Sequence, residues 1–162
     1  GDVYKRQIVY GESECLVKII FNDKCFDLKG YIDTGNVLKD PYFKKSVSIV
    51  DLESLNFGGD SIRQLILDDI ELNTKVKYHM IPYNSLGCES GMLEVITVDS
   101  MYIYTKKKVY AQKNALIGLS TVKLSSDNEF DVLVNIGAVQ AENCIKELKF
   151  GGCYGFKSCG RR

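Results

Sequence analysis

The residues best suited to chemistry are Asp33, Thr34 and Gly35, which follow one another directly after a predicted strand. A carboxylate at the end of a buried strand is costly unless it is hydrogen-bonded. Thr34 offers a hydroxyl and Gly35 an unhindered amide, so the three residues suit a held carboxylate. Two such carboxylates that face each other share one proton and supply an acid and a base to a single water. That pair can hydrolyse an amide without a metal or a covalent intermediate.

The chain contains one Asp-Thr-Gly, so a pair of these carboxylates requires two chains and predicts a symmetric homodimer. Asn36 follows the three residues and is a candidate for supporting their loop. A purely structural interpretation competes with this one, because an Asp-x-Gly turn after a strand is very common. The local chemistry alone leaves both interpretations open.

A polar, glycine-bearing hairpin follows about fifty residues later in the chain. Its position along the chain is where a substrate-covering flap would be, and loops of this composition often move over a bound ligand. The candidate flap residues are Tyr83, Ser85, Gly87 and Gly91.

Alternating apolar and polar residues predict the strand that delivers Asp33. Phe26 and Leu28 fall on one face and Asp27 and Lys29 on the other, after a tight turn that ends an earlier apolar strand, 15–21. Further strands are predicted at 46–50, 76–81, 92–98, 101–104, 108–111, 115–119 and 130–136. Two short helices are predicted, one beginning at the Ser61 capping box and one over 139–149. Many short strands with polar turns favour a mostly β fold, a small closed barrel with these two helices.

The charge balance argues against a nucleic-acid partner. Lys plus Arg and Asp plus Glu both number 21, whereas nucleic-acid binders usually carry a basic excess. The one basic run, Lys106 to Lys108, is interpreted as a solvated edge.

The six cysteines form no Cys-x-x-Cys pair and the chain has one histidine, His79, so neither a metal site nor another cofactor is predicted. Cys15, Cys25 and Cys144 lie in apolar segments, where reduced cysteine packs as a small hydrophobe, which favours the cytosol. His79 is assigned to packing and given no role in the chemistry.

No apolar run reaches the ~18 residues that span a bilayer, so we expect this piece to be soluble. Residues 1–12 are interpreted as a truncated edge, 13–150 as the peptidase-like domain and 151–162 as a glycine-rich basic tail.

The run from Gly30 to Pro41, which reads Gly-Tyr-Ile-Asp-Thr-Gly-Asn-Val-Leu-Lys-Asp-Pro, closely resembles the sporulation sigma-E factor processing peptidase family. The segments 81–87, 123–125 and 130–134 are similar to the same family, and the resemblance covers nearly all of the chain after the first dozen residues.

The resemblance implies that the small closed barrel is of the acid-protease type, a retropepsin-like aspartic peptidase domain that follows an amino-terminal membrane-spanning region absent from this chain. It implies an enzyme at the cytoplasmic face of the membrane that removes the pro-sequence of a sigma-E precursor after activation by a forespore signalling protein. It also implies that Asp33 is catalytic, that Thr34 buttresses the partner loop and that Gly35 lets the two loops approach closely. The glycine-ended strand beside this loop is expected at Phe130 to Ile136 with Gly137, in preference to Leu116-Ile117-Gly118.

Two other functions remain open beside the enzyme. The domain could be a retropepsin-like barrel that binds a protein partner and forms no dyad, or a plain β-barrel in which Asp33 only caps a turn. Dimer geometry distinguishes them, because only the enzyme needs two Asp33 side chains within hydrogen-bond reach of each other.

Overall fold

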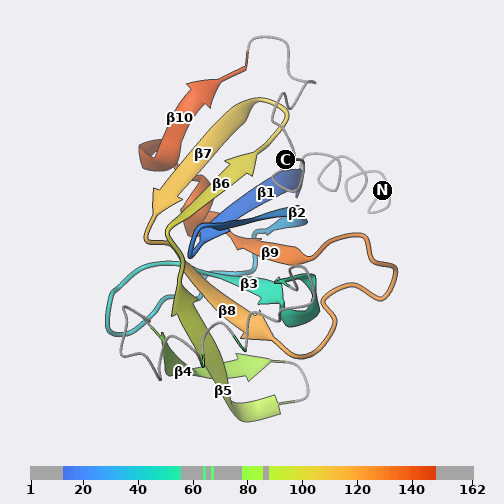
Figure 1. The fold of residues 1–162 in the computed structure, drawn as a ribbon, viewed down its shortest axis with the longest axis vertical. Coiled ribbons are helices and arrows are strands. Elements are labelled where there is room, and N and C mark those ends of the chain that lie inside the picture. Colours follow the sequence, from blue (N-terminus) through green and yellow to red (C-terminus); the bar gives the residue numbers. More distant parts are fainter. Residues whose placement is uncertain (1–12, 56–63, 65–66, 68–77, 86–87, 149–162) are drawn as a thin grey trace.

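The computed structural model describes residues 13–55, 64, 67, 78–85 and 88–148 of the 162-residue chain. Ten strands form one sheet in the order β10-β7-β6-β1-β2-β9-β3-β8-β5-β4, which twists strongly from top to bottom of the molecule (Figure 1). The strands are β1 (Glu14–Phe21), β2 (Lys24–Asp33), β3 (Val47–Asp51), β4 (Tyr78–Ser85), β5 (Cys88–Thr97), β6 (Ser100–Tyr104), β7 (Lys108–Lys113), β8 (Leu116–Ser120), β9 (Val132–Asn135) and β10 (Cys144–Glu147). Three short 3₁₀ helices complete the described part, η1 (Leu52–Leu55), η2 (Ile136–Val139) and η3 (Ala141–Asn143).

The β1–β2 hairpin forms as its sequence pattern predicts. Asn22 and Asp23 both have positive φ angles, 53° and 63°, as a two-residue turn between right-twisted strands requires. Along β2 the side chains of Phe26 and Leu28 are buried and those of Asp27 and Lys29 are exposed. The hairpin therefore carries the chain from a buried face directly to Asp33, the last residue of β2.

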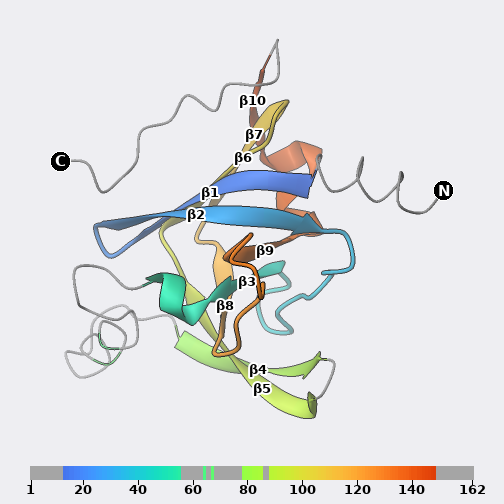
Figure 2. The ribbon, with the colours of Figure 1, turned by 90° about the vertical axis from the view of Figure 1, so that its right-hand side faces the viewer.

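A parallel strand pairing at the centre of the sheet places β9, a strand near the end of the described chain, beside Asp33. β9 pairs parallel with β2, so that Asp33 lies opposite Asn135, and pairs antiparallel with β3 on its other side. Figure 2 shows β9 and β3 below the β1–β2 hairpin and the β4–β5 hairpin at the lower end. The expectation that 130–136, and not Leu116-Ile117-Gly118, lies beside the Asp33 loop is confirmed.

Two hydrophobic clusters hold the sheet together. The larger one joins β1, β2, β6, β8 and β9, and the smaller one lies where β3, β4, β5 and β8 meet, with Val47, Ile81 and Val95 fully buried. Gly30 packs against the larger cluster. A Cβ added at this position would lie 2.6 Å from Val17 Cγ2 and 2.8 Å from Cys15 Sγ. Glycine is therefore required three residues before Asp33 by the closeness of β1.

Two fold predictions need correction. The sheet is open, with β10 and β4 as its edges, so the predicted closed barrel is wrong. The helix predicted over 139–149 is also wrong, because this segment forms η3 and then β10, which pairs with β7. Pairing with β7 overrides the helical spacing of the apolar residues, and Ile145 is 60% exposed. The helix predicted from Ser61 falls mostly outside the described residues, of which Gln64 and Leu67 are helical.

The cysteines differ in state. Cys15 and Cys144 are free thiols, whereas Cys25 is disulfide-bonded, so the expectation of a reduced cysteine is wrong at that position. Burial raises the pKa of the Cys15 thiol to about 12, which keeps it protonated and unreactive at neutral pH.

Two features are absent from the described residues. No helix in this part of the chain is long and apolar enough to cross a membrane. No group of three histidine, cysteine or acidic side chains is placed there to hold a metal ion.

Candidate active site

The Asp33 loop is a tight turn that begins where β2 ends. The backbone N–H of Asn36 donates to the Asp33 carbonyl oxygen at 2.9 Å, and the Gly35 N–H donates to Asp33 Oδ1 at the same distance. Asp33 is half-buried while Thr34 and Gly35 are exposed. The carboxylate is thus oriented by its own turn, and among the described residues no partner is recorded for its other oxygen.

Gly35 is fitted closely to the carboxylate that it binds. A Cβ at this position would lie 3.3 Å from Asp33 Oδ1, tighter than most such contacts in proteins. The turn therefore favours glycine for the space beside the Asp33 carboxylate, and a larger residue would have to displace that carboxylate.

Asn135, which the sequence analysis did not single out, connects the loop to the centre of the sheet. Its amide nitrogen donates to Asn36 Oδ1 at 3.2 Å, to the Leu38 carbonyl at 2.8 Å and to the Val47 carbonyl at 3.1 Å. Its side-chain oxygen accepts from the Gly137 N–H at 2.8 Å, and the residue is 1% exposed. The only hint in the sequence was a polar residue at the end of an apolar strand, just before Ile136 and Gly137.

Asn36, the sequence-based candidate for loop support, takes part in the same network from the other side. Its amide nitrogen lies 3.4 Å from the carbonyl oxygens of both Val47 and Leu133, and its side-chain oxygen accepts from the Leu38 N–H at 3.2 Å. Asn36 and Asn135 together fix the path of the chain as it leaves Asp33, so that the turn is held by β3 and β9.

A cleft of about 410 Å³ separates the Asp33 loop from the β4–β5 hairpin. Its walls combine the loop, the strands behind it and the hairpin: Asp33, Gly35, Asn36, Val37, Leu38, Ile49, Pro82, Tyr83, Asn84 and Leu133. Of the predicted flap residues, Tyr83 lines this cleft, Gly91 lies opposite Tyr83 in the strand pairing and Ser85 pairs with Cys88. Gly87 lies outside the described residues. Among the described lining residues Asp33 is the one carboxylate.

His79 and Asp40 form a hydrogen-bonded contact that the sequence did not predict. His79 lies on β4, and its Nε2 contacts Oδ2 of Asp40. Asp40 lies in the loop between β2 and β3, and its side chain is 0% exposed. Asp40 Oδ1 accepts from the backbone N–H groups of Tyr42 and Phe43 at 2.8 and 3.0 Å. Burial alone would raise the pKa of the Asp40 carboxyl, but the His79 and backbone hydrogen bonds outweigh it and lower that pKa.

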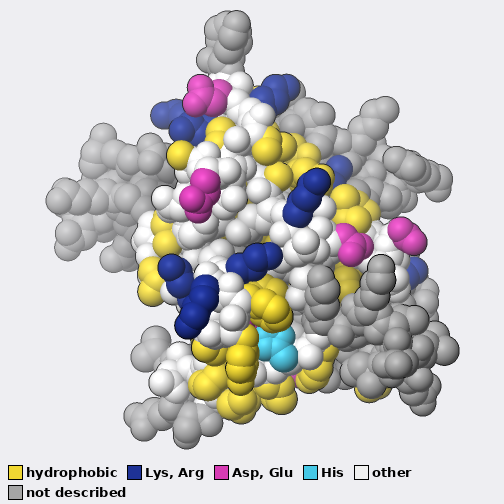
Figure 3. Space-filling model, turned by 90° about the vertical axis from the view of Figure 1, so that its left-hand side faces the viewer, with side chains coloured by type: hydrophobic (Ala, Val, Ile, Leu, Met, Phe, Trp, Pro, Cys, Tyr) yellow, Lys and Arg dark blue, Asp and Glu magenta, His cyan; other side chains and the backbone are white. Residues whose placement is uncertain are grey.

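The surroundings of His79 are apolar. The rings of Tyr42 and Phe43 meet the His79 ring edge-on, with centroids 6.0 and 5.5 Å away. Figure 3 shows the histidine at the surface among hydrophobic side chains. The packing role predicted for His79 is therefore present, but the residue also binds a buried carboxylate.

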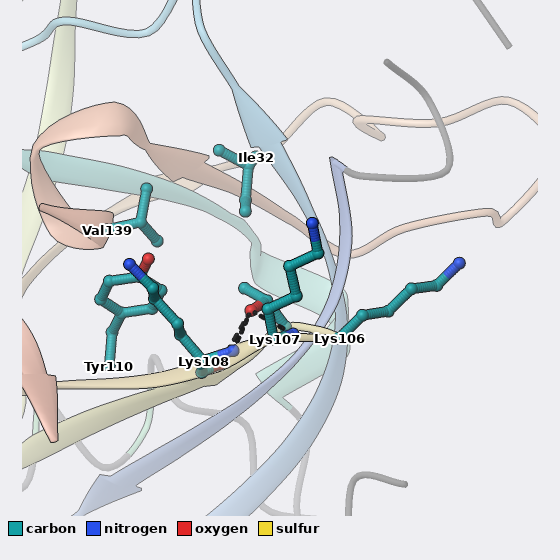
Figure 4. Close-up of a pocket in the computed structure, with 7 residues that line it drawn as sticks. Ile32, Lys106, Lys107, Lys108, Tyr110 and Val139 are labelled. Carbon is teal, nitrogen blue, oxygen red and sulfur yellow. Dashed lines mark hydrogen bonds between the residues drawn. The ribbon is translucent and has the colours of Figure 1, made fainter. Parts of the chain in front are cut away.

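A second cavity of about 270 Å³ is lined by Ile32, the residue before Asp33. Tyr110 and Val139 also line it, beside the turn between β6 and β7, where Lys107 and Lys108 extend on either side and Lys106 points away (Figure 4). Lys106 and Lys107 are exposed, as expected for a solvated run, although they lie in a turn and Lys108 begins β7, which is not an edge strand. Because no carboxylate lines this cavity in the described part of the chain, the Asp33 cleft is the better candidate for hydrolysis.

The fold and the cleft describe a mostly β domain with one oriented carboxylate that faces a hairpin. The family model described as "Peptidase_U4: Sporulation factor SpoIIGA" matches residues 2–137. The chain therefore belongs to this family of sporulation peptidases.

Two relatives are named as sporulation sigma-E factor-processing peptidases. The chain is 30% identical to the one from Bacillus subtilis (strain 168) over 148 residues, which cover 83% of this chain and 47% of the relative. It is 27% identical to the one from Priestia megaterium over 128 residues, which cover 74% of this chain and 42% of the relative. The chain thus spans less than half the length of these two relatives. No solved structure matches the chain.

Proposed function

We propose that this chain is the peptidase domain of an aspartic endopeptidase that removes the pro-sequence of a sporulation sigma-E factor precursor. The names of the relatives support the substrate. The observation that carries the catalytic type is the position of Asp33, oriented by the Gly35 N–H at the wall of a cleft of about 410 Å³.

In the proposed mechanism two chains each contribute one Asp33 to a shared site. The two carboxylates hold one proton between them, because both cannot be ionised cheaply at such close range. The ionised one takes a proton from a water as the water oxygen attacks the scissile carbonyl carbon, while the protonated one donates its proton to the carbonyl oxygen. Collapse of the tetrahedral intermediate, with a proton delivered to the leaving nitrogen, gives a carboxylic acid and an amine.

The other residues of the site have supporting roles in this proposal. Thr34, exposed at the tip of the turn, is available to a partner loop, and Gly35 leaves room for two loops to approach. The β4–β5 hairpin forms the opposite wall through Tyr83 and covers an extended peptide as a flap. The family resemblance further supports a membrane-tethered longer protein, acting at the cytoplasmic face and activated by a forespore signalling protein.

The direct test is to replace the carboxylate and follow processing of the precursor in cells. Asp33→Asn and Asp33→Ala in the full-length protein, co-expressed with a sigma-E precursor, are expected to abolish the shortened product. Circular dichroism and thermal melting of the isolated domain should remain close to wild type, because Asp33 is half-buried and bonds only to its own turn in the described structure. A folded Asp33→Ala protein that still trims the precursor would show that the catalytic assignment is wrong.

A further inference from the structure

The contact between His79 and Asp40 joins the two walls of the Asp33 cleft. Asp40 lies in the segment that leaves the Asp33 turn, and Leu38 within that segment lines the cleft. His79 lies on β4, three residues before Pro82, where the hairpin wall of the cleft begins. The hydrogen-bonded pair of His79 and Asp40 therefore connects the base of the hairpin to the loop that follows the Asp33 turn, beside the edge-on contacts of Tyr42 and Phe43 with His79.

The Asp40 side of this contact is rigidly built. The Asp40 N–H donates to the Lys45 carbonyl and the Lys44 N–H donates to the Asp40 carbonyl, both at 2.9 Å, which closes the loop on itself. Upstream, the Leu38 carbonyl accepts from Asn135 Nδ2 at 2.8 Å and from the Val47 N–H at 3.0 Å. The position of Asp40 is thus set by the same network that holds the Asp33 turn.

The His79 side depends more on the contact. Among the described strands β4 is the last one of the sheet and pairs with β5 alone, so no backbone hydrogen bond between described residues links it to the loop after Asp33. Ile81 anchors the strand in the smaller hydrophobic cluster, but apolar packing is not directional. The His79 hydrogen bond adds a directional link, and the buried Asp40 carboxylate favours it because a charge without water needs every donor within reach.

We propose that His79 is a positioning residue: by binding Asp40 it fixes the base of the β4–β5 hairpin relative to the Asp33 loop and so sets the width of the substrate cleft. This inference rests on the proposed function, since it treats the cleft as the substrate site. The proposed role of His79 is to position the hairpin so that the cleft binds an extended peptide in the correct place. The residue has no part in proton transfer to the substrate.

The kinetic test uses the full-length enzyme with a precursor-derived peptide and three variants. In His79→Ala the hairpin loses its link, and KM is expected to rise on the order of tenfold while kcat changes less than about threefold. His79→Gln keeps a side-chain donor near the position of Nε2 and is expected to restore KM to within about threefold of wild type. Tyr78→Phe is the matched control, because it removes a hydrogen bond inside the hairpin, from the Tyr78 hydroxyl to Glu94 at 2.6 Å, and leaves the loop link intact.

A second measurement, amide hydrogen exchange, tests the link between His79 and Asp40 independently of enzyme activity. Amide hydrogen exchange of the isolated domain should be faster across β4 and β5 in His79→Ala than in wild type or Tyr78→Phe, with β6 and β7 unchanged. Unchanged KM together with unchanged exchange in the hairpin would overturn the proposal, and so would an equal effect of Tyr78→Phe. If Asp33→Asn measured in parallel retains activity, the proposed function fails, and the exchange data still decide whether His79 positions the hairpin.

Discussion

At the scale of single residues, the turn at Asp33 could be predicted from the sequence, whereas the support that it receives from residues far along the chain could not. Asp33-Thr34-Gly35 is a local motif, and its chemistry can be inferred from three adjacent residues. Asn135 reaches the same loop from about a hundred positions away, through a parallel strand pairing that no local pattern reveals. The partnership of His79 with Asp40 is equally non-local, and a lone histidine carries no spacing signal.

Asn135 provides the first residue-scale prediction. Asn135→Leu removes three donated hydrogen bonds and leaves the Gly137 N–H without its acceptor, all at a buried position. We expect a loss of about 2 to 4 kcal/mol in the free energy of unfolding, measured with urea. Gln140→Ala is the control, because Gln140 is exposed and bonds only locally, to the Ile136 carbonyl, so its loss should stay within about 0.5 kcal/mol. Equal stabilities of the two variants would contradict the network.

Asp40 provides a prediction of pH dependence. The folded protein lowers the pKa of the Asp40 carboxyl below its ordinary value of 3.8, so in acid the unfolded chain binds a proton that the folded chain does not. The stability contributed by Asp40 is therefore complete above the unfolded pKa and is lost as the pH falls through the lowered folded pKa. The difference in unfolding free energy between wild type and Asp40→Asn should shrink steadily from about pH 5 towards pH 2. A difference that stays constant over this window would contradict the ionised, hydrogen-bonded state of Asp40.

At the scale of elements, period-two patterns predicted strands well and apolar spacing alone predicted the last helix wrongly. The β1–β2 hairpin has strict alternation and a two-residue turn, two independent signals that agree. The segment 139–149 has apolar residues at helical spacing. That local pattern carries no information about β7, a strand with which part of the segment can pair. Strand pairing with a distant neighbour therefore decides the outcome.

Ile145 distinguishes the two structures of this segment. In the predicted helix its side chain lies on the buried face, whereas in β10 it is 60% exposed. Ile145→Gln is therefore expected to change the free energy of unfolding by less than about 0.5 kcal/mol. Val109→Gln on the neighbouring β7, at a position that is 6% exposed, should cost several times more. A loss above about 2 kcal/mol for Ile145→Gln would favour the buried helix.

At the scale of the whole molecule, the sequence predicted a mostly β domain but not the way in which the sheet ends. Closure of a barrel depends on whether the first and last strands in space meet, and the order from β10 to β4 shows that they do not. The open sheet is still compatible with the proposed chemistry, since the loop after β2 and the β4–β5 hairpin lie on two sides of one cleft. What one chain lacks, in its described residues, is a second carboxylate in that cleft.

The central claim, that two chains share one catalytic site, is tested most directly by mixing active and inactive subunits. Wild-type chain at fixed concentration is combined with a ninefold excess of Asp33→Ala chain under saturating substrate, with serum albumin as the control additive. Random pairing leaves only about a tenth of the wild-type chains with a wild-type partner, so activity should fall to about a tenth. Activity that stays at the level of the albumin control would mean that each chain is complete alone, and would contradict the shared site.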